Sequence, residues 1–171
     1  MRKFYLLLFI LIISALNNYG QKSNVIELIE TRDSQNVKVV FEVGSFIAKQ
    51  HKIQQTENQG TKIDGKAALG TDYSVPQNEI KSINLFFNGK KVSVAKELFS
   101  DCYNPNFEKD SVKLKFSDDG KSVMVFMAGS DGAGGYQIFW IFRNDGNHSR
   151  FSSAGSDTDY TDFINLFFTN K

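Results

Sequence analysis

Three short turn signals constrain the fold of this chain more than any other feature. Each is an Asn-Gly or Asp-Gly pair between two apolar runs, and the pairs lie at 88–89, 119–120 and 145–146. The central residues of a type I′ turn need a positive φ, which Asn, Asp and Gly tolerate, so such a pair is typical of a two-residue hairpin loop. The chain is therefore predicted to contain three antiparallel β-hairpins.

Counting outward from each turn predicts which side chains share one face of a sheet. Residues 123–128 are apolar on both strand faces, as are most of residues 136–142, so these two strands are expected at the centre of a sheet. The predicted cross-strand pairs are Leu85 with Val92, Ile83 with Val94, Phe116 with Val123, Leu114 with Val125, Val112 with Met127, Trp140 with Phe151, and Arg143 with His148.

The N-terminal half carries weaker signals for secondary structure. Residues 25–31 and 37–43 alternate in the manner of a further strand pair joined by a polar turn. Residues 45–70 are rich in Gln, Lys and Gly and fit an edge hairpin, a loop or, over residues 45–54, a poor helix. The sequence leaves these three alternatives open.

One segment has the pattern of a helix. Apolar side chains recur at i, i+3, i+4, i+7 and i+8 over residues 95–103, and Asn104-Pro105 provides a stop signal. The chain has 171 residues, of which 41% are apolar, and can bury a single core. We predict a mainly β protein, an antiparallel β-sandwich or strongly twisted sheet of about eight or nine strands, with one short packed helix near 95–103.

The first twenty residues have the pattern of an export signal. Two basic residues precede an uncharged apolar run over residues 4–16, after which the chain becomes polar. This run is shorter than the roughly 20 apolar residues that span a membrane, so we expect residues 1–20 to be cleaved. The prediction is one β-rich domain over residues 21–171, periplasmic or secreted, with no permanent membrane span.

Composition and charge argue against several classes of function. The 20 basic and 19 acidic residues do not give the concentrated basic charge of a nucleic-acid interface. The histidines are His51 and His148 and the single cysteine is Cys102, so the zinc spacings HExxH and CxxC and an intramolecular disulfide are absent. Cys102 is expected to be a buried structural thiol. We therefore predict no catalytic residue, no cofactor and no nucleic-acid partner.

The C-terminal acidic run offers a weak calcium pattern. Asp157, Asp159 and Asp162 lie within six residues of one another, and calcium prefers carboxylate oxygens. The Gly and Glu positions of an EF-hand loop are missing, so a solvated acidic turn is the simpler interpretation. Residues 159–168 fit either a strand or a helix.

Two loops have compositions that suit binding. Residues 129–136 contain four glycines, which let a backbone approach a ligand closely, and residues 70–76 combine a turn with a tyrosine. If the two loops lie at the same end of the sheet, they form a small acidic and aromatic patch. The candidate binding residues are Asp72, Tyr73, Asp131, Gly132, Gly134 and Tyr136.

These observations favour an exported, non-catalytic protein that binds another exported or envelope protein through the two loops, in the manner of an inhibitor or immunity-type protein. One alternative is a small envelope hydrolase that uses Asp72 and Asp131 as acid and base. Another is a structural domain that responds to calcium through the C-terminal carboxylates.

Overall fold

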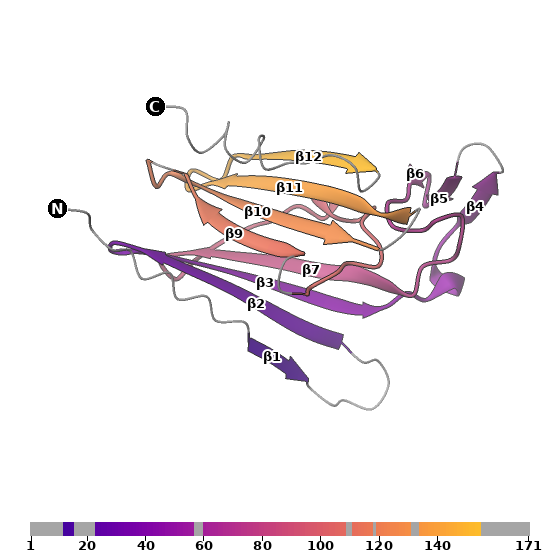
Figure 1. The fold of residues 1–171 in the computed structure, drawn as a ribbon, viewed down its shortest axis with the longest axis horizontal. Coiled ribbons are helices and arrows are strands. Elements are labelled where there is room, and N and C mark those ends of the chain that lie inside the picture. Colours follow the sequence, from indigo (N-terminus) through magenta and orange to yellow (C-terminus); the bar gives the residue numbers. More distant parts are fainter. Residues whose placement is uncertain are drawn as a thin grey trace.

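The computed structural model describes residues 12–15, 23–56, 60–108, 111–117, 119–130 and 134–154 (Figure 1). These residues are mostly strand, and every strand pairing is antiparallel, so the predicted mainly β fold built of hairpins is confirmed. The described part of the chain contains twelve strands in three sheets rather than the expected eight or nine, because residues 45–70 contribute three short ones.

Two larger sheets lie face to face (Figure 1). The five-stranded sheet has the order β1-β2-β3-β7-β8, and its strands are β1 (Ile12–Ala15), β2 (Ser23–Arg32), β3 (Gln35–Ser45), β7 (Asn78–Phe87) and β8 (Lys90–Val92). The four-stranded sheet has the order β12-β11-β10-β9, and its strands are β9 (Val112–Phe116), β10 (Ser122–Gly129), β11 (Tyr136–Arg143) and β12 (His148–Ala154).

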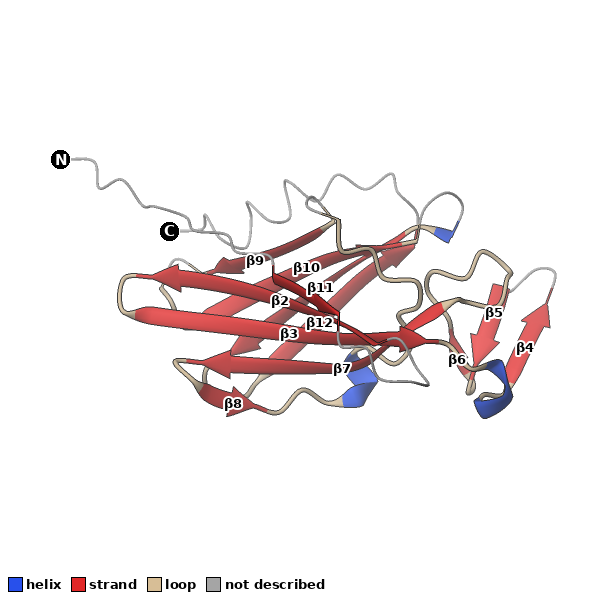
Figure 2. Ribbon diagram, turned by 90° about the horizontal axis from the view of Figure 1, so that it is seen from below, coloured by secondary structure: helices blue, strands red, loops and turns tan. Residues whose placement is uncertain are grey.

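A small third sheet stands at one end of these layers (Figures 1 and 2). Its strands are β4 (Ile53–Thr56), β5 (Gly60–Ile63) and β6 (Lys66–Ala67), in that order. Of the alternatives for residues 45–70, the hairpin is therefore correct, and the described residues of this segment are helical only in one 3-10 turn over Ala48–Gln50.

The main core fills the space between the two larger sheets. Alternate residues of β3 and β7 face alternate residues of β10 and β11, as the two-residue period of a strand requires. Each fully buried side chain of this kind stabilises the fold by roughly 1.5 to 3 kcal/mol. The central members of the core are Val37, Val39, Phe41, Leu85, Val123, Val125, Met127, Ile138 and Trp140.

Strands β10 and β11 are buried on both faces, as their apolar sequences predict. A second cluster on the face away from the main core is formed by Met124, Phe126, Phe139 and Ile141. The exposed Lys113 and Lys115 of β9 share that face, because Lys115 is paired with Met124 and Lys113 with Phe126.

No helix among the described residues is long and apolar enough to cross a membrane.

Two of the three predicted hairpins have the predicted register. Leu85 pairs with Val92 across Asn88-Gly89, whose φ angles of 48° and 77° are those of the expected turn. Around Asp119-Gly120, all three predicted pairs between β9 and β10 are present. The residues 25–31 and 37–43 also pair, within β2 and β3.

The third hairpin is shifted by one residue from its prediction. Phe142, rather than Arg143, is opposite His148, and Trp140 is opposite Arg150. The loop closes with a hydrogen bond from Arg143 N to Asn147 O, which leaves three loop residues ending in Gly146 at φ 91°. A shift of one residue exchanges the faces of a strand, so Trp140 is in the core whereas Phe151 pairs with Phe139 on the outer face.

The segment 95–103 is helical over one turn only. A 3-10 helix covers Lys96–Leu98, and the chain then bends so that Cys102 and Tyr103 bridge to Leu69 and Glu79. Of the apolar stripe, Phe99, Cys102 and Tyr103 are buried and Leu98 is partly buried, whereas Ala95 is exposed. The indole N–H of Trp140 donates to Leu98 O at 2.8 Å. Nine residues are too few for a stable helix without tertiary support, and here the tertiary contacts favour the extended conformation.

Strand β1 lies within the predicted export signal. It pairs with residues 24–27 of β2. Cleavage before Gln21 would remove this partner and leave β2 as the edge strand of the sheet.

Candidate functional site

The described loops at one end of the sandwich form the candidate site, which we call the loop end. It consists of residues 69–78, residues 101–108 and the described part of residues 128–136. The opposite end, which we call the turn end, carries the hairpin turns at 33–34 and 88–89 and those near Gly120 and Gly146 (Figure 2).

The side chain of Asn104 connects two of these loops. Its Oδ1 accepts hydrogen bonds from the backbone N–H groups of Gln77 at 2.9 Å and Asn78 at 3.1 Å, and its Nδ2 donates to Gly70 O at 2.7 Å. Asn104 has a φ of 46°, a left-handed conformation that Asn tolerates better than most residues. One amide group therefore fixes both ends of the segment 70–78.

The backbone of residues 104–106 connects the same segment to the third loop. Asn104 N donates to Asn78 O at 3.0 Å, and Ser130 N donates to Asn104 O at 2.7 Å. Asn106 N donates to Ala128 O at 3.1 Å, and Pro105 bridges to Gly129. All three loops are thus joined through Asn104 and its neighbours before any ligand is bound.

The structure brings Asp72 next to Gly134, as the proposed patch requires. A Cβ atom added to Gly134 would lie 2.9 Å from the Cβ and the backbone N of Asp72, so only Gly fits between the two loops. Asp72 and Tyr73 have φ angles of 40° and 57°, which is strained for residues other than Gly. Gln55 Nε2 donates to Tyr73 O at 2.8 Å and supports this conformation.

Tyr136, which the sequence analysis places in the accessible patch, is buried instead. Only 2% of the residue is exposed, and its ring lies against Gly70 and Gly129, where the absence of Cβ atoms makes room for it. Burial raises the pKa of its hydroxyl well above the ordinary value, and among the described residues the hydroxyl has no hydrogen-bond partner. Tyr136 therefore packs beneath the loops and does not contact a partner directly.

Several candidate residues lie outside the described part of the chain. Asp131 and Gly132 of the Gly-rich loop belong to this group, so the acid and base pair of the hydrolase alternative is not placed. The same holds for Asp157, Asp159 and Asp162 and for the strand or helix over residues 159–168. Among the residues that the structure describes, no group of three or more His, Cys, Asp or Glu could hold a metal ion.

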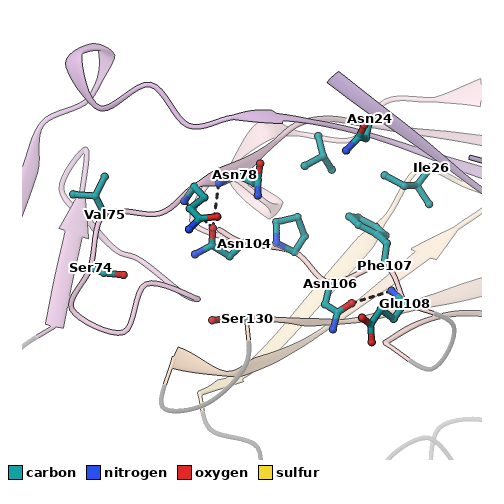
Figure 3. A pocket seen from close by; sticks show the side chains of 13 residues that line it. Asn24, Ile26, Ser74, Val75, Asn78, Asn104, Asn106, Phe107, Glu108 and Ser130 are labelled. Atoms are coloured by element: carbon teal, nitrogen blue, oxygen red, sulfur yellow. Dashed lines mark hydrogen bonds between the residues drawn. The ribbon is translucent and has the colours of Figure 1, made fainter. Parts of the chain in front are cut away.

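An exposed ridge, residues 72–75, separates two cavities. Tyr73 is 59% exposed and Val75 47% exposed, which makes them two of the three large apolar side chains described as exposed. The smaller cavity, of about 190 Å³, is lined in part by Thr61, Asp72 and Tyr73. The larger cavity, of about 790 Å³, lies beside Ser74 and Val75 (Figure 3).

The structure agrees with the prediction of a buried structural thiol at Cys102. Cys102 is 1% exposed, and burial and the nearby Asp101 carboxylate raise its pKa well above the ordinary value, so it is an inert thiol at neutral pH. His148 is exposed at the start of β12.

His51 has a specific environment that the sequence did not predict. Its Nδ1 lies 2.7 Å from Asp64 Oδ2 and its Nε2 lies 3.6 Å from Glu79 Oε1, while its ring stacks on Phe46. The hydrogen bond with His51 lowers the pKa of Asp64. These contacts attach the small sheet to β7, which is a structural role.

The role of Asn104 could not be predicted from the sequence, in which Asn104-Pro105 indicates only the stop of a helix. Its side-chain partners are 26, 27 and 34 positions away along the chain. An Asn before Pro is a frequent turn signal, so nothing local distinguishes this one.

No family model, curated protein or solved structure matches the chain. The geometry of the loop end is therefore the evidence on function. That geometry defines a small β-sandwich whose exposed ridge is held by buried glycine contacts and by one asparagine.

Proposed function

We propose that the protein is an exported, non-catalytic binding protein whose ridge, residues 72–75, contacts another exported or envelope protein. The observation that carries this proposal is the exposure of Tyr73 and Val75 on a loop of fixed, strained conformation. An inhibitor or immunity-type protein uses such a surface.

The chemistry of the ridge favours a protein partner. A Tyr side chain offers a large contact area with only two side-chain torsions to fix, and exposed aromatic residues are frequent anchors of protein interfaces. Val75 extends the apolar area beside it, and Asp72 adds a charge that gives specificity. A loop already held in its binding conformation loses little entropy on association.

The sequence supports export as part of the proposal. The basic and apolar pattern of residues 1–20 is typical of a signal peptide, and its removal takes away two basic residues. The remaining chain has 18 basic and 19 acidic residues, a net charge of −1. A partner in the envelope or outside the cell fits this location.

Quantitative capture tests the proposal. The full chain with a C-terminal tag is expressed in its source organism and recovered from the envelope and secreted fractions, and co-purified proteins are measured by mass spectrometry. The test variant is Tyr73→Ala with Val75→Ser, and the matched control is Phe151→Ser, which removes an exposed ring from β12.

We expect one partner in near-equal amount with the unchanged chain and with the Phe151→Ser control. The amount of partner that co-purifies with the double variant should be at least about tenfold lower, because truncation of an aromatic anchor commonly weakens binding by more than 1 kcal/mol. Equal recovery with the double variant, or no partner with the unchanged chain, would contradict the proposal.

A further inference from the structure

The larger cavity at the loop end has the size of a small-molecule site. Its volume is about 790 Å³, and its walls come from β2, the end of β3, and the loops over residues 74–78 and 104–108 (Figure 3). Ligand sites in proteins are commonly about 300 to 1,000 Å³. The cavity lies on the opposite side of the ridge from Thr61 and Gly134, which line the smaller cavity.

The polar groups around the larger cavity are mainly uncharged. Among the described residues that line it there is one carboxylate, Glu108, and there is no Lys, Arg or His. An anionic ligand would therefore find no cationic partner in the walls. The uncharged polar side chains of the lining include Asn24, Ser74, Gln77, Asn78, Asn104 and Asn106.

Some of these amides hold the loops together, and others are available to bind a ligand. Asn104 uses its side chain to hold the loops, so it forms a rigid wall. Asn106 Oδ1 accepts the N–H of Glu108 at 2.9 Å, which fixes the amide and leaves its NH₂ group available. Asn24 and Asn78 are exposed, and their side chains make no hydrogen bond with the described residues (Figure 3).

The available amides match a hydroxyl-bearing ligand. An amide side chain offers both donors and acceptors, and each hydroxyl group can likewise donate and accept. Asn24, Asn78 and Asn106 approach the cavity from three separate segments (Figure 3). Such a set can bind hydroxyl groups on different edges of one ring.

The same cavity has an apolar wall. Phe107 lines it, and its ring is held by a tilted contact with Phe41 at 5.1 Å between centroids. Ile26 and Val43 also line this wall. A sugar ring has apolar C–H faces and a polar rim of hydroxyl groups, so it can pack on this wall while its rim meets the amides.

We propose that this cavity binds a neutral saccharide of one or two rings. The saccharide packs against Phe107 and is hydrogen-bonded by Asn78 and Asn106. This site adjoins the protein contact proposed for the ridge, because Ser74 and Val75 line the cavity, but the sugar contacts of Asn78, Asn106 and Phe107 do not depend on that contact.

Titration followed by NMR tests the saccharide site. The ¹⁵N-labelled full chain is titrated with glucose, N-acetylglucosamine and cellobiose, each up to about 10 mM, a range that detects weak binding. Inorganic phosphate and the blocked peptide N-acetyl-trialanine amide are titrated as comparison ligands. We expect at least one neutral sugar to shift the side-chain amide signals of Asn78 and Asn106.

Variants locate the binding. Asn78→Ala with Asn106→Ala should weaken the binding of that sugar at least about tenfold, as expected when two hydrogen bonds are lost. The control Asn144→Ala removes an exposed amide at the turn end and should change nothing. Tyr73→Ala should leave sugar binding unchanged, because Tyr73 does not line this cavity, and the variant therefore distinguishes the sugar site from the Tyr73 contact.

Three results would overturn the proposal. The first is that none of the sugars shifts these signals in the unchanged chain. The second is that phosphate or the blocked peptide binds more tightly than every sugar. The third is that the Asn78 and Asn106 double variant binds sugar as well as the Asn144→Ala control.

Discussion

The two ends of the sandwich are closed by different kinds of contact. At the turn end, neighbouring residues such as Asn88 and Gly89 close each hairpin, and a positive φ is required only within the turn itself. At the loop end, the described loops are joined through Asn104, whose side chain bonds residues that are 26 to 34 positions away. The turn end also has long-range hydrogen bonds, such as those between Asn36 and Asn88, but its hairpin turns close locally, whereas the described loops of the loop end take their shape only in the completed fold.

This difference has a consequence for function. A surface held by long-range hydrogen bonds has its binding shape only in the folded protein, and it can carry strained residues such as Asp72 and Tyr73. The hairpin turns also contain positive φ angles, at Asp33 and Asn88, but these residues belong to the tight turns themselves. Both cavities described beside the ridge are at the loop end.

The largest effect should follow from a methyl group at the loop end. Gly129→Ala places a Cβ atom inside the buried ring of Tyr136, and overpacking in a rigid core should lower the free energy of unfolding by about 3 kcal/mol. At the turn end, the Cβ atom of Gly89→Ala would lie in open space, so the only cost is the strain of a φ of 77° for alanine. The free energy of unfolding should therefore fall by about 1 kcal/mol. Urea unfolding of both variants measures the difference, and equal losses would show that the two ends are packed alike.

A comparison of two asparagines isolates the hydrogen bonds at each end. Asn104 and Asn88 have φ angles of 46° and 48°, but the Asn104 side chain makes three hydrogen bonds to backbone groups whereas Asn88 Oδ1 accepts one, from Asn36 N. The backbone strain of an Ala substitution is therefore matched. Asn104→Ala should destabilise the protein by about 2 kcal/mol more than Asn88→Ala, since two more bonds are lost.

Thermal and urea unfolding of the two asparagine variants give this difference directly. If the two substitutions have the same effect, Asn104 does not hold the loop end. The Asn144→Ala variant should stay within about 0.5 kcal/mol of the unchanged chain.

A smaller, pH-dependent effect is expected near the turn end. Burial raises the pKa of Glu30 to about 6, although the N–H of Phe116 and the charges of Lys115 and Arg32 oppose the shift. Because the folded state then holds the proton more tightly than the unfolded state, stability should fall as the pH rises from about 4.5 through 6. Glu30→Gln should flatten this dependence and add about 1 kcal/mol at pH 7, after allowance for solvent screening.

Urea unfolding of the unchanged chain and of Glu30→Gln from pH 4 to pH 8 measures this effect. If the free energy of unfolding of the unchanged chain and that of Glu30→Gln vary with pH in the same way, Glu30 does not have the raised pKa described above. Loop-end variants such as Asn104→Ala should leave the shape of the pH curve unaltered.

The predictability of the fold follows the same division between the two ends. Asn88-Gly89 and Asp119-Gly120 specify the register of their hairpins within a few residues, so those pairings could be predicted from sequence, although only Asn88-Gly89 has the two positive φ angles of a type I′ turn. The shift at Gly146 arose because a three-residue loop ending in Gly and a two-residue loop have similar sequences. The stripe over residues 95–103 predicted the burial of Phe99, Cys102 and Tyr103 but not the conformation, which bridges to Leu69 and Glu79 decide.

The candidate site was predictable only in part. The sequence indicated two loops of suitable composition, and the structure places Asp72 against Gly134. It could not indicate that Tyr136 would be covered or that Asn104 would join the loops, because both depend on contacts with distant segments. The amide-lined cavity also draws on separate segments, and no single stretch of sequence contains it.

The central claim is that Asn104 holds the loop end in its binding shape before a partner arrives, and native-state hydrogen exchange tests it most directly. In the free protein, the amides of Gln77, Asn78 and Ser130 should be protected, and Asn104→Ala should remove the protection of Gln77 and Asn78. The amide of Asn88 at the turn end should be unaffected. Exchange of Gln77 and Asn78 at the rate of an unfolded chain in the unchanged protein would contradict the claim.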